Sequence, residues 1–287
     1  VLSDRETVAV DLEADSMFHF REKVCLIQMS AKQSVFVIDP LMVPDLSALK
    51  PVFETRRIMK IFHGADYDIR SLYRDFGIKI ENLFDTQLAS RYLGYKETGL
   101  DAVLRRHFNI QVNKKYQKKD WSERPLSEKM VEYAAVDAFY LVPLAEILIN
   151  KLKEKKRLKW VLEECGSLSR VRPAENNGAP LFLRFKEAGK LNRRRLAVLE
   201  NLLQLRVTFA EEKDRPLFKI FGNSTVTKLV RSMPDTMAKL KKSKSLSGKQ
   251  IGMFGEEIVS AVSDALKIPD DQLPFYPRSR SPVLDPD

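Results

Sequence analysis

The chain has 287 residues, which is long enough for one mid-sized domain and a smaller second one. Hydrophobic residues make up 44% of it, and no apolar run reaches the roughly 18 residues that a transmembrane helix needs, so we expect a soluble globular protein without such a helix. The formal net charge of +10 favours a polyanionic partner, which is either a nucleic acid or an anionic membrane surface.

The cysteines and the first residues bear on the compartment. Cys25 and Cys165 are the only cysteines and have no metal-site spacing, so we expect reduced thiols in a cytoplasmic protein. The opening VLSDRETVAV lacks the basic and apolar regions of a secretory signal. It also lacks Met and leads almost directly into a strand pattern, which predicts a processed or trimmed terminus.

Short β-rich runs come first in the chain. Residues 7–13, 24–30 and 34–39 are separated by polar, turn-like segments, which predicts a three-stranded meander. Further strand patterns at 58–63 and 81–85 alternate with helical patterns. We therefore predict an α/β first domain with a mixed sheet.

The first strand carries two carboxylates. Asp11 and Glu13 are two residues apart in VAVDLEAD, and strand side chains alternate with a period of two, so both leave the same face of the sheet. Adjacent like charges repel each other, but a cation between them removes the repulsion. Hard divalent ions such as Mg²⁺ take oxygen ligands of this kind.

A later helical pattern offers a third carboxylate. The segment SEKMVEYAAVDAFYLVPL predicts a helix that begins near Ser127, a suitable N-cap, and that Pro143 kinks or ends. Tyr133 and Asp137 are four residues apart and lie one turn above each other on one face. The helix can thus present one more metal ligand with a phenol beside it.

The second half of the chain has a different composition. KLKEKKRLKW, residues 151–160, predicts a basic helix, and RPAENNGAP, residues 172–180, is typical of a linker. Beyond it, helical spacing of apolar residues at Leu196, Leu199, Leu203 and Val207, followed by predicted caps at Asn223 and Asp235, indicates a small all-helical domain. The final segment, 268–287, is rich in Pro and charge, which predicts an extended or disordered tail.

Taken in order, the motifs of the first half resemble the 3′ to 5′ exonuclease domain of the DEDDy class, most closely that of RNase D. VDLEAD resembles the first motif, FHGADYDIRSL the second and YAAVDAFYL the third, in which Tyr-x-x-x-Asp marks the tyrosine subclass. The segments DTQLASRYLG, TGLDAVL and DWSERPLSEKM resemble connecting segments of the same group. The resemblance spans residues 7–145 and implies an RNase H-like exonuclease domain over residues 1–165.

The resemblance also implies the chemistry. It implies phosphodiester hydrolysis with two divalent metal ions, Mg²⁺ or Mn²⁺. Asp11 would bridge both ions, Glu13 and Asp137 would complete the first site, and Asp68 would hold the second, in part through water. Tyr133 would orient the attacking water, because a phenol with an ordinary pKa near 10 is a poor general base at neutral pH.

Five further residues are candidate contacts of the nucleic acid, namely Phe18, His19, Gln28, His63 and Arg124. Each also has a structural interpretation. The aromatic pair after the first motif could stack on the terminal base or belong to the core. Gln28 could reach the site or pair within the sheet, and Arg124 could contact phosphate. For His63 a hydrogen-bonded structural role is the favoured interpretation.

Three residues beside the motifs are predicted to be structural. Asp66 and Asp85 are interpreted as helix caps, although an active-site role for Asp85 is left open. Trp121 is predicted to be a packing anchor.

Residues 178–266 resemble an HRDC domain, the helical module that RNase D shares with RecQ-type helicases. The resemblance rests on the helix order, on residues 196–221 and on the closing GEEIVSAV. The loop SLSGKQIGMFGEE before that helix has Ser where the family often has Gly. Basic clusters that could touch nucleic acid recur at Lys114, Lys115, Lys118 and Lys119 in one loop, at Arg193–Arg195, and at Lys241, Lys242 and Lys244 in another loop.

The resemblance therefore implies a metal-dependent 3′ to 5′ exoribonuclease that trims the single-stranded 3′ ends of structured RNA precursors such as tRNA, and no membrane partner. Two alternatives are a 3′ to 5′ DNA exonuclease of the same class and a catalytically silent RNA-binding scaffold. The presence of all five catalytic positions argues against the scaffold. The sequence leaves the oligomeric state open.

Overall fold

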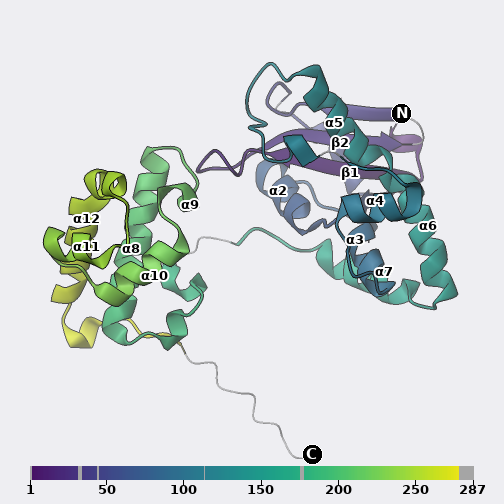
Figure 1. The fold of residues 1–287 in the computed structure, drawn as a ribbon. Helices are drawn as coiled ribbons and strands as arrows, with labels where there is room; N and C mark the ends of the chain where they lie inside the picture. Colours follow the sequence, from purple (N-terminus) through teal and green to yellow (C-terminus); the bar gives the residue numbers. More distant parts are fainter. Residues whose placement is uncertain (1, 32–33, 44, 113, 175–177, 278–287) are drawn as a thin grey trace, which may run out of the picture. The chain divides into compact units, whose positions relative to one another are not determined.

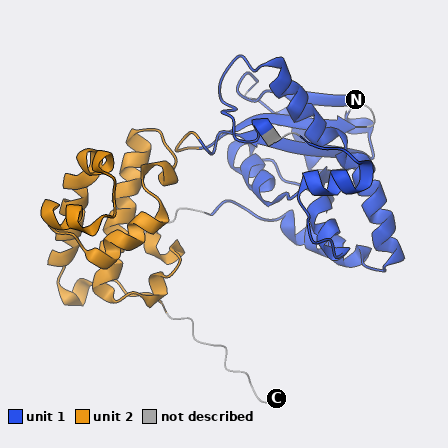
Figure 2. Cartoon of the chain, viewed as in Figure 1, with its two compact units in different colours: residues 1–17, 22–174 blue, residues 18–21, 175–287 orange. Residues whose placement is uncertain are grey.

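The computed structural model describes residues 2–31, 34–43, 45–112, 114–174 and 178–277. The chain divides into two compact units, one of residues 1–17 with 22–174 and one of residues 18–21 with 175–287 (Figure 2). Each unit has a hydrophobic core of its own. Within the described ranges, no helix is both long and apolar enough to cross a bilayer.

The first unit is built on a mixed five-stranded sheet in the order β3-β2-β1-β4-β5 (Figure 1). The strands are β1 Thr7–Ala14, β2 Val24–Ala31, β3 Ser34–Ile38, β4 Met59–Phe62 and β5 Leu83–Asp85. β2 pairs antiparallel with β1 and β3, whereas β4 pairs parallel with β1 and β5. The predicted meander, the two later strands and the α/β class are confirmed.

The register of β1 and β2 determines which side chains share a face. Asp11 is paired with Gln28, and Glu13 is paired with Leu26. Paired residues in an antiparallel ladder project from the same face of the sheet. Asp11, Glu13 and Gln28 therefore start from one face, as the strand alternation predicts for the two acids.

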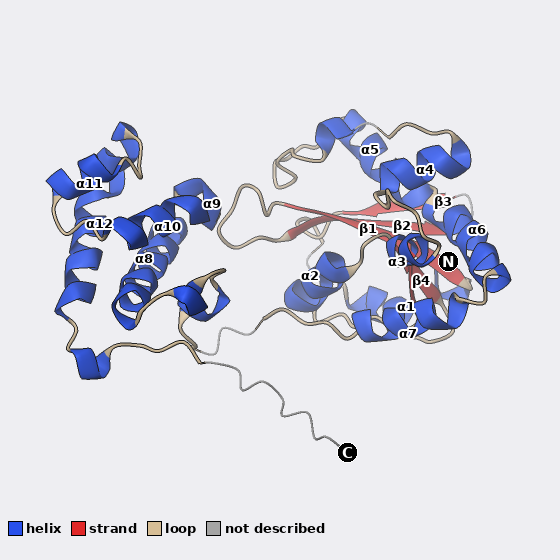
Figure 3. Ribbon diagram, turned by 60° about the horizontal axis from the view of Figure 1, so that its bottom comes forward, coloured by secondary structure: helices blue, strands red, loops and turns tan. Residues whose placement is uncertain are grey.

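Helices cover both faces of this sheet (Figure 3). They are α1 Lys50–Phe53, α2 Asp66–Phe76, α3 Thr86–Tyr92, α4 Leu100–Phe108, α5 Glu128–Phe139, α6 Leu141–Glu154 and α7 Leu158–Leu168. α5 contacts β1, β2 and β3. It therefore lies over the three strands of the meander and brings its own side chains to the strand that carries Asp11.

The ends of α5 follow from local sequence. Ser127 stands at the N-cap with an extended backbone, as predicted, although its side chain makes no capping hydrogen bond. The helix ends at Phe139, and Tyr140 joins it to α6. Pro143 lies in the first turn of α6, where its missing N–H costs nothing, so the break comes three residues earlier than the proline itself.

The single basic helix predicted for residues 151–160 is wrong. α6 ends at Glu154 and α7 begins at Leu158, with Lys156 between them at a φ of 56°. A left-handed residue cannot continue a right-handed helix. The run of charges carries no turn signal such as Gly or Pro, which is why the sequence did not reveal the break.

The second unit is helical and confirms the all-α prediction. Its helices are α8 Arg193–Glu212, α9 Leu217–Ile220, α10 Asn223–Ser232, α11 Met237–Ser243 and α12 Gly248–Lys267. α8 and α12 are in contact, and Leu199 and Ile258 are fully buried in the core of this unit. The predicted apolar spacing along α8 is confirmed, with Leu196, Leu199 and Leu203 buried and Val207 half-buried.

Three details of the second unit differ from prediction. The N-caps of α10 and α11 are Gly222 and Thr236, one residue away from the predicted Asn223 and Asp235. Lys241 and Lys242 belong to the last turn of α11, and Lys244 is its C-cap. Most of the supposed loop 245–257 is helical, because Ser247 and Gln250 form a capping box that starts α12 at Gly248.

The beginning of the predicted tail is ordered. Leu273 is 7% exposed, and Tyr276 packs against the core of the second unit, with its ring centroid 6.4 Å from that of Phe182. Of the two predicted states, the disordered one is wrong for residues 268–277, whose apolar side chains reach the helical core, whereas the backbone at Leu273 is extended. The rest of the predicted tail, 278–287, lies outside the described residues.

Candidate metal centre and active site

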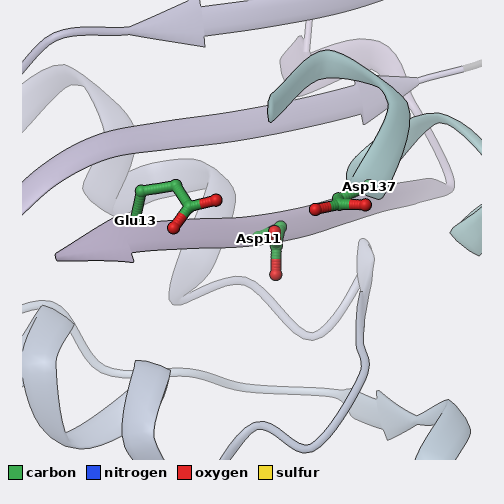
Figure 4. Close-up of side chains that lie close together, drawn as sticks. All are labelled: Asp11, Glu13 and Asp137. Atoms are coloured by element: carbon green, nitrogen blue, oxygen red, sulfur yellow. The ribbon is translucent and has the colours of Figure 1, made fainter. Parts of the chain in front are cut away.

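Three carboxylates meet at the face of the sheet that α5 covers. Asp11 and Glu13 come from β1 and Asp137 comes from α5 (Figure 4). One oxygen from each residue can be chosen so that all three lie within 4.8 Å of one another. The residues line a cavity of about 380 Å³ that also includes Tyr133 and His63. The structure thus brings together the acids of the first and third motifs.

Burial and mutual repulsion raise the pKa values of these acids. Burial is the main cause for Asp11, whose pKa lies well above its usual range, and the charges of Asp68 and Asp137 add to it. Burial, followed by the charge of Asp11, raises the pKa of Glu13 to about 10. For Asp137 burial raises the pKa to about 6. The cluster is an unfavourable place for negative charge unless a cation shares it.

The donor set fits a divalent metal ion. Oδ1 of Asp137 is buried and accepts no hydrogen bond within the described part of the chain. An unsatisfied buried carboxylate oxygen is costly, and it becomes favourable as soon as a cation accepts its lone pair. An all-oxygen set of acids is the ligand type that Mg²⁺ and Mn²⁺ prefer.

Asp68, from the second motif, acts on this cluster through its charge. It lies on α2, is 9% exposed and does not line the cavity. Its charge still contributes to the raised pKa of Asp11. Burial first, and then the charge of Asp85, raises the pKa of Asp68 itself to about 7.

Tyr133 is held in place by aromatic neighbours. Its ring stacks on Trp121 with centroids 6.1 Å apart and lies 5.7 Å from the ring of Tyr116. Burial and the charge of Asp137 raise the pKa of the Tyr133 phenol, so the hydroxyl stays protonated and donates a hydrogen bond to Asp137. Trp121 is 1% exposed, which confirms the predicted packing anchor.

Asp85 organises the loops around the second motif. Its carboxylate accepts hydrogen bonds from the backbone N–H groups of Gln87 and Leu88 as the N-cap of α3, which confirms that prediction. It also accepts from Gly64 N and Ala65 N at 3.1 and 2.8 Å, immediately before α2. One side chain therefore connects the starts of two helices.

Asp66 does not cap α2. It is the first residue of that helix, and its carboxylate binds Arg70 one turn later at 2.7 Å. The predicted cap is wrong because Ala65 holds the N-cap position, so Asp66 already lies inside the helix.

His63 lines the cavity and also has a structural partner. Its Nδ1 lies 2.9 Å from Oγ1 of Thr86, and its Nε2 is buried without a partner among the described residues. Burial lowers its pKa, which favours a neutral ring. The favoured hydrogen-bonded interpretation is confirmed, and contact with nucleic acid stays a prediction.

Gln28 and Arg124 lie outside the lining of the cavity. Gln28 is fully buried, and neither end of its amide has a hydrogen-bond partner within the described ranges. Arg124 binds both oxygens of Asp39, at 2.7 and 2.8 Å, and donates to the carbonyls of Trp121 and Cys25. These contacts engage its guanidinium in the fold, so its predicted phosphate contact gains no support from the geometry.

Phe18 and His19 belong to the second unit and have partners there. The Phe18 ring lies 4.4 Å from Nζ of Lys219. Nδ1 of His19 lies 2.7 Å from Oδ2 of Asp214. Neither residue lines the acidic cavity, so the predicted stacking on a terminal base gains no support from their positions.

Several polar residues of the cavity were missed from the sequence, namely Gln87, Asp101 and Gln117. Asp101 is in the first turn of α4, where an acid is typical of any helix start. Gln87 follows the cap of α3, and Gln117 follows a short 3-10 turn. The sequence signal that could have identified these three residues was their position in the segments between the motifs.

The mixed sheet and its carboxylate cluster belong to a 3′ to 5′ exonuclease domain, as the family match shows. The model of the 3′ to 5′ exonuclease family matches residues 1–153, and that of the HRDC domain matches residues 195–262. Ribonuclease D of Bartonella henselae is 30% identical over 284 residues, which are 96% of this chain and 69% of that protein. The chain therefore belongs to the ribonuclease D family, whose members are hydrolytic exoribonucleases.

Two further relatives agree with this assignment. The crystal structure of Escherichia coli RNase D, an exoribonuclease involved in structured RNA processing, has 26% identity and a TM-score of 0.77, covering 95% of this chain and 73% of that one. Protein RRP6-like 2 of Arabidopsis thaliana is 28% identical over 91% of this chain. The chain spans 32% of the length of that plant protein.

Proposed function

We propose that this chain trims the 3′ ends of RNA, with structured precursors such as tRNA as its substrates, and uses two divalent metal ions. The observation that carries the proposal is the approach of Asp11, Glu13 and Asp137 to within 4.8 Å in a cavity that also contains Tyr133. Asp11, Glu13 and Asp137 would hold one ion, and Asp11 and Asp68 the other. Mg²⁺ or Mn²⁺ suits these oxygen ligands.

When bound, the ions activate water and stabilise the charge that develops on the phosphate. Tyr133 has a separate task. Its ring is fixed by Trp121 and Tyr116, and its raised pKa keeps the proton on the oxygen. Because that proton is donated to Asp137 in a hydrogen bond, the phenol oxygen meets water with its lone pairs, as a hydrogen-bond acceptor. Tyr133 therefore orients the attacking water through a hydrogen bond and does not act as the base.

His63 and the glutamines of the cavity are suited to the substrate. Gln87 and Gln117 line the cavity and carry both donors and acceptors for the ribose and base of the terminal nucleotide.

Cys25 and Cys165 are buried free thiols, which supports a reducing compartment, and the cytoplasm is the compartment that we propose for the enzyme.

The test compares RNA and DNA of equal sequence, each labelled at the 5′ end, with Mg²⁺, with Mn²⁺ and with EDTA. We expect the RNA to shorten from its 3′ end with either metal and to remain intact in EDTA. Faster shortening of the DNA would make the chain a DNA exonuclease of the same class. Binding of RNA without any shortening would make it a scaffold.

A further inference from the structure

A second cavity lies entirely within the helical unit. It has a volume of about 220 Å³ and is lined by the segment before α8, by the first turns of α8 and by α10. Leu199 and Val230 are buried beneath it, and Phe185 and Leu191 are half-buried at its walls. The cavity therefore offers an apolar surface to a small ring system.

Cations surround this apolar surface. Lys186, Lys190, Arg195 and Arg231 line the cavity together with a single acid, Glu187. Arg231 lies 4.0 Å from Glu187, so that acid is already shared with one of the four cations. The side chains of the other three cations have no hydrogen bond or ion pair within the described ranges. The rim thus has an excess of positive charge.

The start of α8 explains why Arg195 is available to bind an anion. Three arginines occupy the first turn of this helix, where the helix dipole disfavours cations, and no acid stands among them. Arg194 donates to Ile268 O and binds Asp270 at 2.6 Å, and Arg193 donates to Leu273 O at 2.5 Å. Arg195 has no such partner among the described residues, and its Nε is buried. A bound anion would relieve this unfavourable charge.

An apolar floor under a cationic rim suits a ligand with a planar ring and an anionic group. We propose that this cavity is a nucleotide subsite that holds one base of an RNA strand against Phe185 and Leu199, with the phosphate beside Arg195 and Lys190. An RNA strand supplies both groups in each nucleotide, and bases stack on aromatic side chains without regard to sequence. The choice of RNA as the ligand rests on the proposed function, whereas the shape and charge of the cavity do not.

The rim is tested by RNA binding of the whole chain in EDTA, where no hydrolysis interferes. A labelled single-stranded RNA is titrated by fluorescence anisotropy at several salt concentrations. Arg195→Gln should weaken binding about fivefold or more and lower the slope of log affinity against log salt by about 0.7, the value for one lost phosphate contact. Lys228→Gln is the matched control, because Lys228 is exposed on α10 and does not line the cavity.

The apolar floor of the cavity is tested by filling the space above it with a larger side chain. Thr227 lines the cavity from α10 and is half-buried, so Thr227→Phe should occupy the space for the base. We expect about tenfold weaker binding of RNA, an unchanged salt slope, and no change for an abasic strand of equal length. Equal losses from Arg195→Gln and Lys228→Gln, or equal losses for RNA and the abasic strand, would overturn the proposal.

A direct measurement on the unaltered protein covers the case in which a variant does not fold. Addition of 5′-AMP should shift the methyl NMR signals of Val230, and inorganic phosphate should shift them less. An unmoved Val230 signal, or displacement of 5′-AMP by a Glu- and Phe-containing peptide at lower concentration, would overturn the subsite. Because these measurements need no metal, they are independent of whether the chain hydrolyses RNA.

Discussion

At the residue scale, the acidic cluster combines charge repulsion with a shape that suits a cation. Burial and neighbouring charges hold the pKa of Glu13 near 10 and that of Asp11 well above its usual range. Binding of a divalent ion therefore competes with protonation of these carboxylates. Replacement of one of them by a neutral side chain should harm the reaction more than the stability of the fold.

Replacement of a single ligand tests this statement. Asp11→Asn and Asp137→Asn should each lower hydrolysis by more than about a hundredfold, because one electrostatic ligand is lost from the reaction centre. In EDTA the melting temperature should not fall, because each change removes a repelling carboxylate. Near-normal Mg²⁺-dependent turnover in either variant would show that the metal assignment is wrong.

Tyr133→Phe tests the role of the phenol. The ring contacts with Trp121 and Tyr116 are kept, so the fold should be unaffected. Turnover should fall by roughly ten- to a hundredfold, because the hydrogen bond acts mainly in the transition state, while RNA affinity changes by less than about twofold. Single-turnover rates and anisotropy separate the two quantities. Equal losses in both would point to a tyrosine that only binds substrate.

Much of this site could be predicted from residue spacing. Alternation along β1 correctly put Asp11 and Glu13 on one face, and the spacing of four put Tyr133 beside Asp137. The cavity residue Asp101 could not be predicted, because a helix start explains an acid at that position equally well. The partners of Arg124 and His19 also depend on long-range contacts that local sequence does not report.

At the element scale, the loops around the site depend on Asp85. This residue is 1% exposed and accepts four backbone hydrogen bonds from the beginnings of α2 and α3. α2 carries Asp68, so Asp85 also fixes the position of one predicted metal ligand. The strands and helices around Asp85 could be predicted from the sequence. The hydrogen bonds that join Asp85 to the start of α2 could not, because Gly64 is distant from Asp85 in the sequence.

Asp85→Ala should therefore destabilise the first unit by about 3 kcal/mol, because it removes a helix cap and leaves buried N–H groups without an acceptor. Urea unfolding followed by tryptophan fluorescence measures this quantity. Asp45→Ala is the control, since Asp45 is exposed and accepts from the nearby Ser47 N, so its loss should cost about 1 kcal/mol or less. Equal losses of unfolding free energy in Asp85→Ala and Asp45→Ala would contradict the claim that Asp85 stabilises the starts of both helices.

At the scale of the whole molecule, the first unit buries two hydrophobic clusters and the second unit buries its own, which predicts two unfolding events, one for each unit. Both tryptophans, Trp121 and Trp160, belong to the first unit, whereas helices dominate the second. Tryptophan fluorescence therefore reports on the first unit, and far-ultraviolet circular dichroism reports on both.

Mg²⁺ should stabilise only the first of these transitions. At a Mg²⁺ concentration about 100 times the dissociation constant, the stabilisation should be about 2.7 kcal/mol in the fluorescence transition and absent in Asp11→Asn. An equal shift of both transitions, or a shift that Asp11→Asn retains, would show that the ion binds elsewhere.

The most direct test of the central claim follows one RNA strand labelled at its 5′ end in Mg²⁺, once with a free 3′ hydroxyl and once with a blocked 3′ end. We predict a ladder of products that shorten by one nucleotide at a time from the free strand, no shortening of the blocked strand, and no products with Asp11→Asn. Internal cuts, equal loss of both strands, or shortening that persists in EDTA would contradict the account.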